Sequence, residues 1–86
     1  MTKVFKHYSD PSHGWVAVKR ELIESLGLAE KITVFSYEKG KTAYLEEDLD
    51  APTVLDELTR RGVAWKVVSI DHGDRSPIRS YPRFVV

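Results

Sequence analysis

No cysteine occurs among the 86 residues of this chain, so its fold must form without disulfide bonds or a thiolate-bound metal. A chain of this length forms one domain. Folding would bury roughly 64% of its surface, which is enough for one small hydrophobic core. We therefore expect a single domain over residues 1–86, and we exclude an enzyme with separate catalytic and regulatory domains.

Charge and hydropathy further limit the class of protein to which this chain can belong. The 13 basic and 13 acidic side chains cancel, which excludes a uniformly basic coat protein for nucleic acid. With 42% hydrophobic and 30% charged residues, the composition is that of a globular protein. No stretch approaches the length of a membrane-spanning helix, and the first ten residues lack the apolar core of a signal peptide. We therefore expect a cytoplasmic protein that does not contact membranes.

Periodicity predicts the order of strands and helices. Residues 3–8 and 15–18 are rich in β-formers and are separated by turn residues, which predicts two short strands or one interrupted strand. Helical spacing then runs from Lys19 to Gly27. A second helix begins at Asp50, predicted to be its N-cap, has an apolar stripe of Val54, Leu55 and Leu58, and ends at Gly62. Residues 63–70 are predicted to form the last strand.

Residues 33–37 and 42–46 are predicted to form a hairpin with Lys39 and Gly40 at its tip. Strand alternation then gives the hairpin one aliphatic and one aromatic face. The aromatic face resembles the base-stacking platform of sheet-based RNA binders, but the RNP1 spacing is missing, so packing in the core is favoured. The predicted pairs are Tyr37 with Thr42 and Phe35 with Tyr44 on the aromatic face, and Ser36 with Ala43 and Val34 with Leu45 on the other.

The order of elements predicts an α+β fold: a small antiparallel sheet with two helices packed on one face, in the ferredoxin-like (split βαβ) order. Residues 74–86 lie outside this unit. Pro77 and Pro82 oppose a helix there, so this segment is predicted to be an ordered arm or an edge strand after Ser80.

The acidic residues cluster, because residues 42–58 contain six carboxylates and no base. One interpretation is a capped helix with a solvated flank. The other is a surface that imitates the phosphates of nucleic acid and occupies a Lys/Arg groove of a protein partner. The predicted partner-binding residues are Glu46, Glu47, Asp48, Asp50, Asp56 and Glu57.

A basic, aromatic segment follows near the C-terminus and alternates arginine with proline and aromatic residues. Arginine binds phosphate and aromatic rings stack on bases, so the segment is a candidate contact for single-stranded nucleic acid. Alternatively, Tyr81 and Phe84 attach the tail to the sheet while the arginines pair with the acidic stretch. The candidate nucleic-acid contacts are Arg75, Arg79, Tyr81 and Arg83.

Histidines are the only candidates for acid–base chemistry. His7, His13 and His72 show no metal-ligand spacing, and the chain has no nucleophile elbow or phosphate loop. The three aspartates beside them, Asp10, Asp71 and Asp74, are also typical of turns. We predict a protein that is not an enzyme and holds no cofactor or metal. A small ribonuclease or toxin that uses His13 and His72 is the less favoured alternative.

Three stretches carry a family resemblance: Tyr8–Trp15, Ser36–Pro52 and Arg75–Tyr81. Together they resemble a family of small uncharacterised proteins carried by bacteriophages and prophages of proteobacteria. Its members often have cysteine at the position of Leu49 and proline at that of Lys19. The resemblance implies a small protein of a mobile element, similar in size and character to anti-CRISPR proteins that block type I interference complexes.

The resemblance and the charge pattern together predict a monomeric inhibitor of a bacterial defence system, such as a CRISPR effector. It would bind a host protein or nucleoprotein complex stoichiometrically and block nucleic-acid binding through its acidic surface, as a DNA mimic. The alternative is an accessory protein of a mobile element that binds nucleic acid directly through its C-terminal arm.

Overall fold

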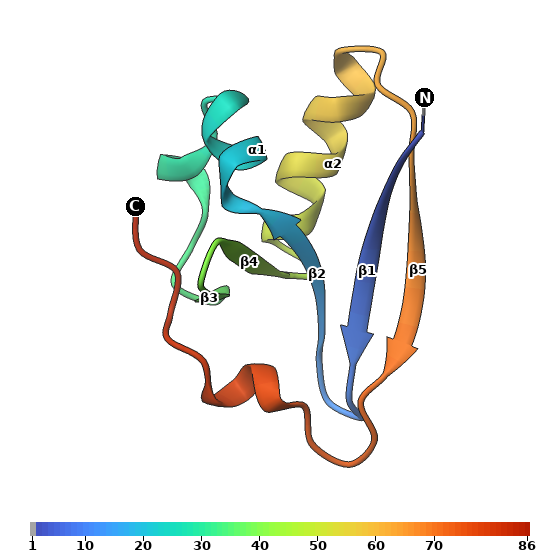
Figure 1. Cartoon of the computed structure of the whole chain (residues 1–86), viewed down its shortest axis with the longest axis vertical. Helices are drawn as coiled ribbons and strands as arrows, with labels where there is room; N and C mark the ends of the chain where they lie inside the picture. The colour runs from blue at the N-terminus through green and yellow to red at the C-terminus, as the bar shows by residue number, and fades with distance from the viewer. Residues whose placement is uncertain (1) are drawn as a thin grey trace.

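A computed structural model describes residues 2–86 as five strands and two α-helices, with two short 3₁₀ helices (Figure 1). The elements are, in chain order, β1 (Lys3–Ser9), β2 (Gly14–Lys19), α1 (Arg20–Ser25), η1 (Ala29–Lys31), β3 (Tyr37–Lys39), β4 (Thr42–Glu46), α2 (Asp50–Arg60), β5 (Trp65–Asp71) and η2 (Pro77–Ser80).

The five strands form one mixed sheet in the order β3-β4-β2-β1-β5. β1 and β5 are parallel, whereas the other three neighbouring pairs are antiparallel. The α+β class is thus confirmed, but the prediction of an antiparallel sheet is wrong. The ferredoxin-like order is not confirmed, because β1 and β2 form a central hairpin with no helix between them. The helix α2 instead carries the chain from β4 to the far edge, where β5 runs parallel to β1.

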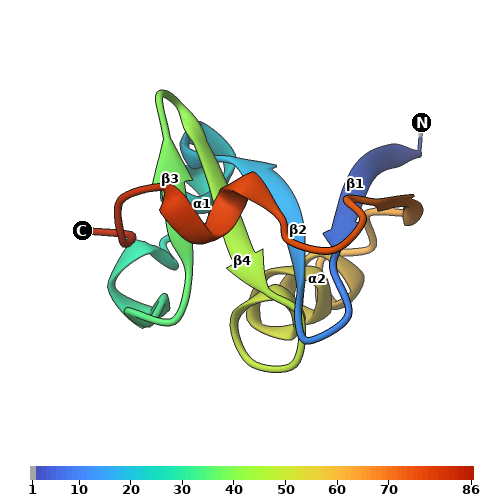
Figure 2. The ribbon, with the colours of Figure 1, turned by 90° about the horizontal axis from the view of Figure 1, so that it is seen from below.

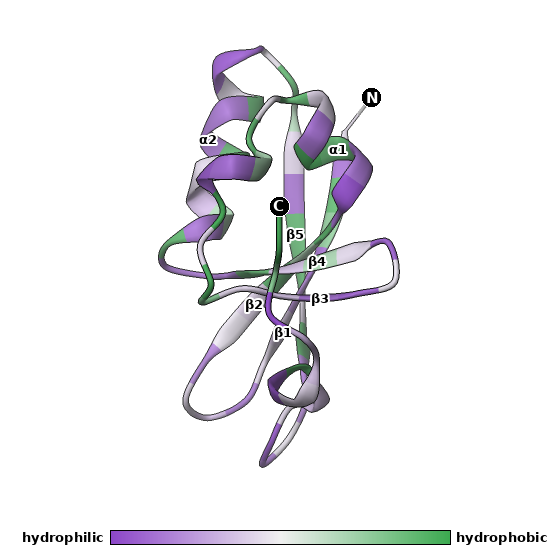
Figure 3. Cartoon of the chain, turned by 90° about the vertical axis from the view of Figure 1, so that its left-hand side faces the viewer, coloured by the Kyte–Doolittle hydropathy of each residue, from purple (hydrophilic) through white to green (hydrophobic). Residues whose placement is uncertain are grey.

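One hydrophobic core lies between the helices and one face of the sheet. Alternate residues of the strands supply it, such as Phe5 on β1 and Val16 on β2. The predicted stripe of α2 is buried as expected, and in Figure 3 the hydrophobic part of α2 turns toward α1 and the strands. The buried core residues are Phe5, Val16, Val18, Ile23, Leu28, Ile32, Ala43, Leu45, Ala51, Val54, Leu55, Leu58 and Phe84.

Both helices end where the sequence predicts, at glycines with positive φ. Gly27 (φ 72°) follows α1 and Gly62 (φ 77°) follows α2, a conformation that costs glycine little. The start of α2 differs from the prediction, because Asp50 is its first helical residue and its carboxylate accepts from Thr33 and Ser36 rather than from an amide of α2. The Asp50 side chain is 1% exposed and turns inward.

The hairpin register differs from the predicted one by two residues. Tyr37 pairs with Tyr44 and Lys39 with Thr42, and Gly40 and Lys41 form the turn. Residues 33–36 form no strand, and Phe35 is 59% exposed. Two hydrogen bonds of Thr33 explain the difference. The Thr33 hydroxyl accepts from the Phe35 amide (3.2 Å), which bends this segment into a turn, and it donates to Asp50, which holds the turn against α2.

The C-terminal arm, residues 74–86, is ordered and crosses the hairpin of β3 and β4 (Figure 2). Its side chains Ile78 and Phe84 are buried. After Ser80 it makes one isolated bridge, between Arg83 and Tyr37, rather than a full edge strand. The described part of the chain contains no helix with the length and apolar character needed to cross a membrane.

Candidate nucleic-acid interface

The sheet face opposite the core, called the open face below, carries mainly aromatic and basic side chains. Because side chains alternate along a strand, the residues that neighbour the core residues along each strand point to this face. It carries four lysines and a single carboxylate, Glu46. The register places on it Val4, Lys6, Tyr8, Trp15, Ala17, Lys19, Tyr37, Lys39, Thr42, Tyr44, Glu46, Lys66, Val68 and Ile70.

Three tyrosines line up across the open face and form what we call the tyrosine row: Tyr8, Tyr44 and Tyr81. The ring centroids of Tyr8 and Tyr44 are 6.2 Å apart, and those of Tyr44 and Tyr81 are 5.2 Å apart. The His72 ring stacks on Tyr8 at 4.5 Å, and Lys39 Nζ lies 4.9 Å from the centroid of the Tyr81 ring. The sequence placed Tyr81 in the arm, and the fold brings it to strands β1 and β4.

The hydroxyl of Tyr44 stays protonated at neutral pH. Burial raises the pKa of Tyr44, and the neighbouring Tyr81 and Tyr8 raise it further. A protonated hydroxyl can donate a hydrogen bond to a phosphate or base oxygen. Tyr44 therefore adds no negative charge to the open face, whose lysines make it attractive to anions.

Asp10 attaches the arm to the β1–β2 turn. Arg79 donates to it through Nε (2.6 Å) and Nη2 (2.8 Å), and the Ser76 amide donates a further bond (2.9 Å). The amides of Ser12 and His13 also point to this carboxylate, each at 3.1 Å. Its side chain is 1% exposed, and the bonds from Arg79, followed by that from Ser76, hold the pKa of Asp10 well below its usual range.

This lowered pKa predicts acid sensitivity. A depressed carboxylate pKa stabilises the fold above the unfolded pKa, here about 3.8, and the stabilisation is lost as the pH falls toward the folded value. We expect the melting temperature of the wild type to drop as the pH falls below about 4. The variant Asp10→Asn is expected to be less stable at neutral pH and to lose less on acidification. Melting curves from pH 7 to pH 2 measure this, and parallel curves for both proteins would contradict it.

The other arginines of the arm have different surroundings. The Arg83 guanidinium lies 4.4 Å from the Tyr37 ring centroid and donates to the Val34 carbonyl (3.1 Å). Arg75 is exposed. Of the four predicted arm contacts, Tyr81 joins the open face, Arg79 and Arg83 are engaged within the fold, and Arg75 faces solvent. The expectation that the arm pairs with the acidic stretch is wrong for Arg79, whose partner is Asp10.

The six predicted acidic contacts do not form one surface. Asp50 lies in the interior, where Thr33 and Ser36 donate to it. Glu57 binds both Arg60 and Arg61, and these hydrogen bonds lower its pKa to about 2. Asp50 therefore cannot meet a partner, and Glu57 is already neutralised.

The remaining four acidic residues lie at the C-terminal end of β4, namely Glu46, Glu47 and Asp48, and on α2, namely Asp56. Glu47 is hydrogen-bonded to His7 Nε2 at 2.6 Å, and the Glu46 carboxylate accepts from the Asp48 amide at 3.2 Å. Asp48 and Asp56 are exposed. Of the predicted acidic surface, Glu47, Asp50 and Glu57 are thus engaged with other side chains, and Glu46 with a backbone amide.

The histidines occupy three separate environments. His7 contacts Glu47, His13 lies 6.0 Å from the Trp15 ring, and His72 stacks on Tyr8 while bonding to the Ser76 hydroxyl at 2.7 Å. Within residues 2–86 no hydrogen bond or ring pairing joins His13 to His72. The same residues contain no group of three or more histidine or carboxylate side chains placed to hold a metal ion.

The chain matches no protein-family model, no curated protein and no solved structure. The resemblance to a phage protein family therefore stays a prediction from the three sequence stretches.

Sequence reasoning missed Lys6, Tyr8 and Lys19 as members of an interface. The signal was present, because alternation in the predicted strands puts Lys6 and Tyr8 on the side opposite Phe5. Nothing in the local pattern, however, indicates that β1 and β4 both lie next to β2, which is what brings Tyr8 to Tyr44.

Proposed function

We propose that this chain binds single-stranded nucleic acid through the open face, as an accessory protein of a mobile element. The observation that carries the proposal is the tyrosine row flanked by Lys6, Lys19 and Lys39. Stacking of bases on aromatic rings combined with a basic surface along the backbone is how proteins bind single strands without strong sequence preference.

A single strand fits the open face better than a duplex does. Tyrosine rings can stack only on bases that are unpaired and splayed out, whereas the paired bases of a duplex already stack on one another. Within residues 2–86 both α-helices, the elements that could enter a major groove, pack on the opposite side of the sheet. Binding is therefore expected to prefer single strands over duplexes of the same length.

Fluorescence anisotropy with a labelled oligo(dT) of about 15 nucleotides and the matching duplex tests the proposal. Binding of the single strand should weaken from about 50 to about 200 mM salt, because each phosphate contact releases a counterion. The variant Lys39→Ala should make the negative slope of log K against log salt shallower by about 0.7. Lys31→Ala, on η1 beside the helices, is the matched control and should leave the slope unchanged.

No binding of single strands at low salt would overturn the proposal. The predicted inhibitor role makes the opposite forecast, since a DNA mimic binds a basic protein and not DNA itself. That role draws on six carboxylates, of which Glu47, Asp50 and Glu57 have partners within the fold. Direct binding is thus the function that the geometry supports best.

A further inference from the structure

A groove opens where β1 and β2 separate. Their pairing runs from Ser9 and Gly14 to Lys6 and Ala17 and ends there. Residues 3–5 of β1 continue beside β5 alone, whereas β2 turns into α1 (Figure 1). The space between β1 and α1 is about 720 Å³ and is open on one side, within the range of small-molecule and nucleotide sites.

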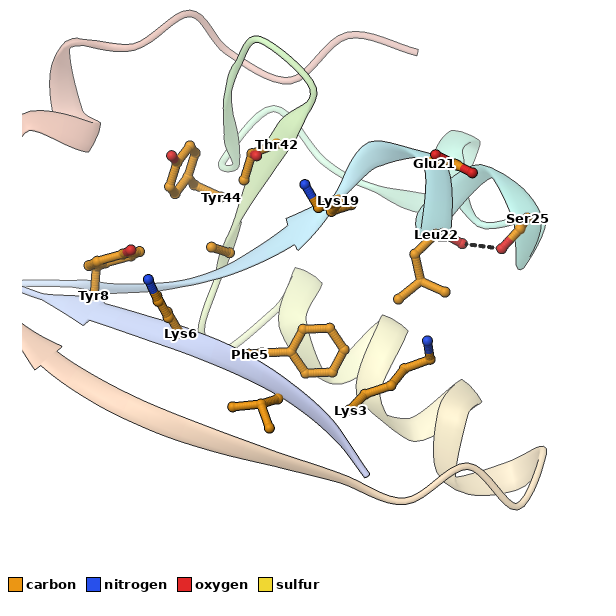
Figure 4. Close-up of a pocket in the computed structure, with 12 residues that line it drawn as sticks. Lys3, Phe5, Lys6, Tyr8, Lys19, Glu21, Leu22, Ser25, Thr42 and Tyr44 are labelled. Atoms are coloured by element: carbon orange, nitrogen blue, oxygen red, sulfur yellow. Dashed lines mark hydrogen bonds between the residues drawn. The ribbon is translucent and has the colours of Figure 1, made fainter. Parts of the chain in front are cut away.

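The groove combines an apolar wall with a basic rim (Figure 4). Phe5 and Leu22 supply apolar surface, from β1 and α1 respectively. The charged lining residues are Lys3, Lys6, Lys19 and Glu21, so three ammonium groups face one carboxylate. This balance favours an anion, and the apolar wall favours one that carries a flat or hydrophobic part.

The groove continues the tyrosine row, because Tyr8 and Tyr44 line both. A strand that stacks along Tyr81, Tyr44 and Tyr8 would therefore reach the groove without leaving the surface. An inorganic anion would neutralise the lysines but leave apolar lining in contact with water, namely Val4, which is 54% exposed, and the half-buried Leu22. Phe5 is only 7% exposed and presents its edge to the groove. A nucleotide satisfies both parts, since its base is flat and its phosphate is charged.

We infer that this groove receives one nucleotide of the bound strand, an inference that rests on the proposed function. The base lies against Phe5 and Leu22, and the neighbouring phosphates contact Lys3, Lys6 and Lys19. The groove thereby adds a recess to an otherwise flat stacking surface, and it accounts for Lys3, which lies off the open face.

Photo-cross-linking locates the base. An oligo(dT) that carries 5-iodouracil is irradiated in complex with the full chain, and the modified residues are mapped by mass spectrometry. The expected result is an adduct on Phe5 in addition to adducts on the tyrosine row. Adducts on Tyr8, Tyr44 or Tyr81 without Phe5 would overturn the groove while leaving the proposed function intact. Failure to bind at all would overturn both.

Two matched double variants test the lysines. Lys3→Ala with Lys19→Ala removes two charges from the groove, and Lys39→Ala with Lys66→Ala removes two from the open face outside it. Each pair should make the negative salt slope shallower by about 1.4 if both lysines contact phosphate. Only the groove pair should abolish the Phe5 adduct at protein concentrations that saturate the oligonucleotide. Loss of this adduct in both pairs, or in neither, would overturn the assignment of the groove.

Discussion

Replacing Asp50 with alanine is expected to lower the free energy of unfolding by about 3 kcal/mol, because it leaves buried donors without an acceptor. Asp50 accepts from the Thr33 amide (3.1 Å), the Thr33 hydroxyl (2.7 Å) and the Ser36 hydroxyl. Ser36 in turn accepts from the Glu46 amide at 2.9 Å. One carboxylate thus connects the 33–36 turn to both α2 and β4.

The effect should reach the arm as well. The Phe84 amide donates to the Ser36 carbonyl at 2.9 Å, so a turn that moves without Asp50 also releases one anchor of the C-terminal residues. Urea unfolding followed by circular dichroism measures the free energy, and proteolysis of residues 81–86 reports the arm. Asp48→Ala is the control, since Asp48 is exposed and its change should stay within about 0.5 kcal/mol. Equal stability of the two variants would refute the structural role of Asp50.

Substituting Tyr8 with leucine is expected to weaken binding of single-stranded oligonucleotides by about 10- to 100-fold. Each base stacked on an aromatic ring contributes about 1–3 kcal/mol, and 1.4 kcal/mol corresponds to tenfold in affinity. Leucine keeps an apolar side chain against Tyr44 but removes the flat surface on which a base can stack. Fluorescence anisotropy titrations at constant salt measure the loss.

Phe35→Leu provides the matched control for this substitution. Phe35 is aromatic and 59% exposed but lies outside the open face, so its loss should leave affinity unchanged. The salt slope separates stacking from charge: Tyr8→Leu should weaken binding at every salt concentration without altering the slope, whereas lysine variants alter the slope. Equal affinities of Tyr8→Leu and the wild type would exclude stacking on the tyrosine row.

The candidate interface was only partly predictable. The sequence indicated an aromatic hairpin face and a basic arm, and Tyr37, Tyr44 and Tyr81 do lie on the same side of the sheet. It assigned Tyr37 and Tyr44 to the core, because periodicity shows that two side chains share a face but not which face is covered. It also predicted an acidic surface that included Asp50, because a carboxylate at a helix start is usually solvated.

Local pattern alone determined where the helices lie, where Gly27 and Gly62 end them, and which residues of α2 face the core. These features depend on backbone conformation and on the spacing of neighbouring side chains, and a few consecutive residues determine both. Only the tertiary structure decided the parallel pairing of β1 with β5 and the contact of Asp10 with Arg79, 69 residues away. Alternative pairings of this kind differ in the free energy of contacts between segments far apart in the sequence, and no local pattern determines that free energy. The tyrosine row on the open face exists because these long-range pairings place three tyrosines, from β1, β4 and the arm, side by side.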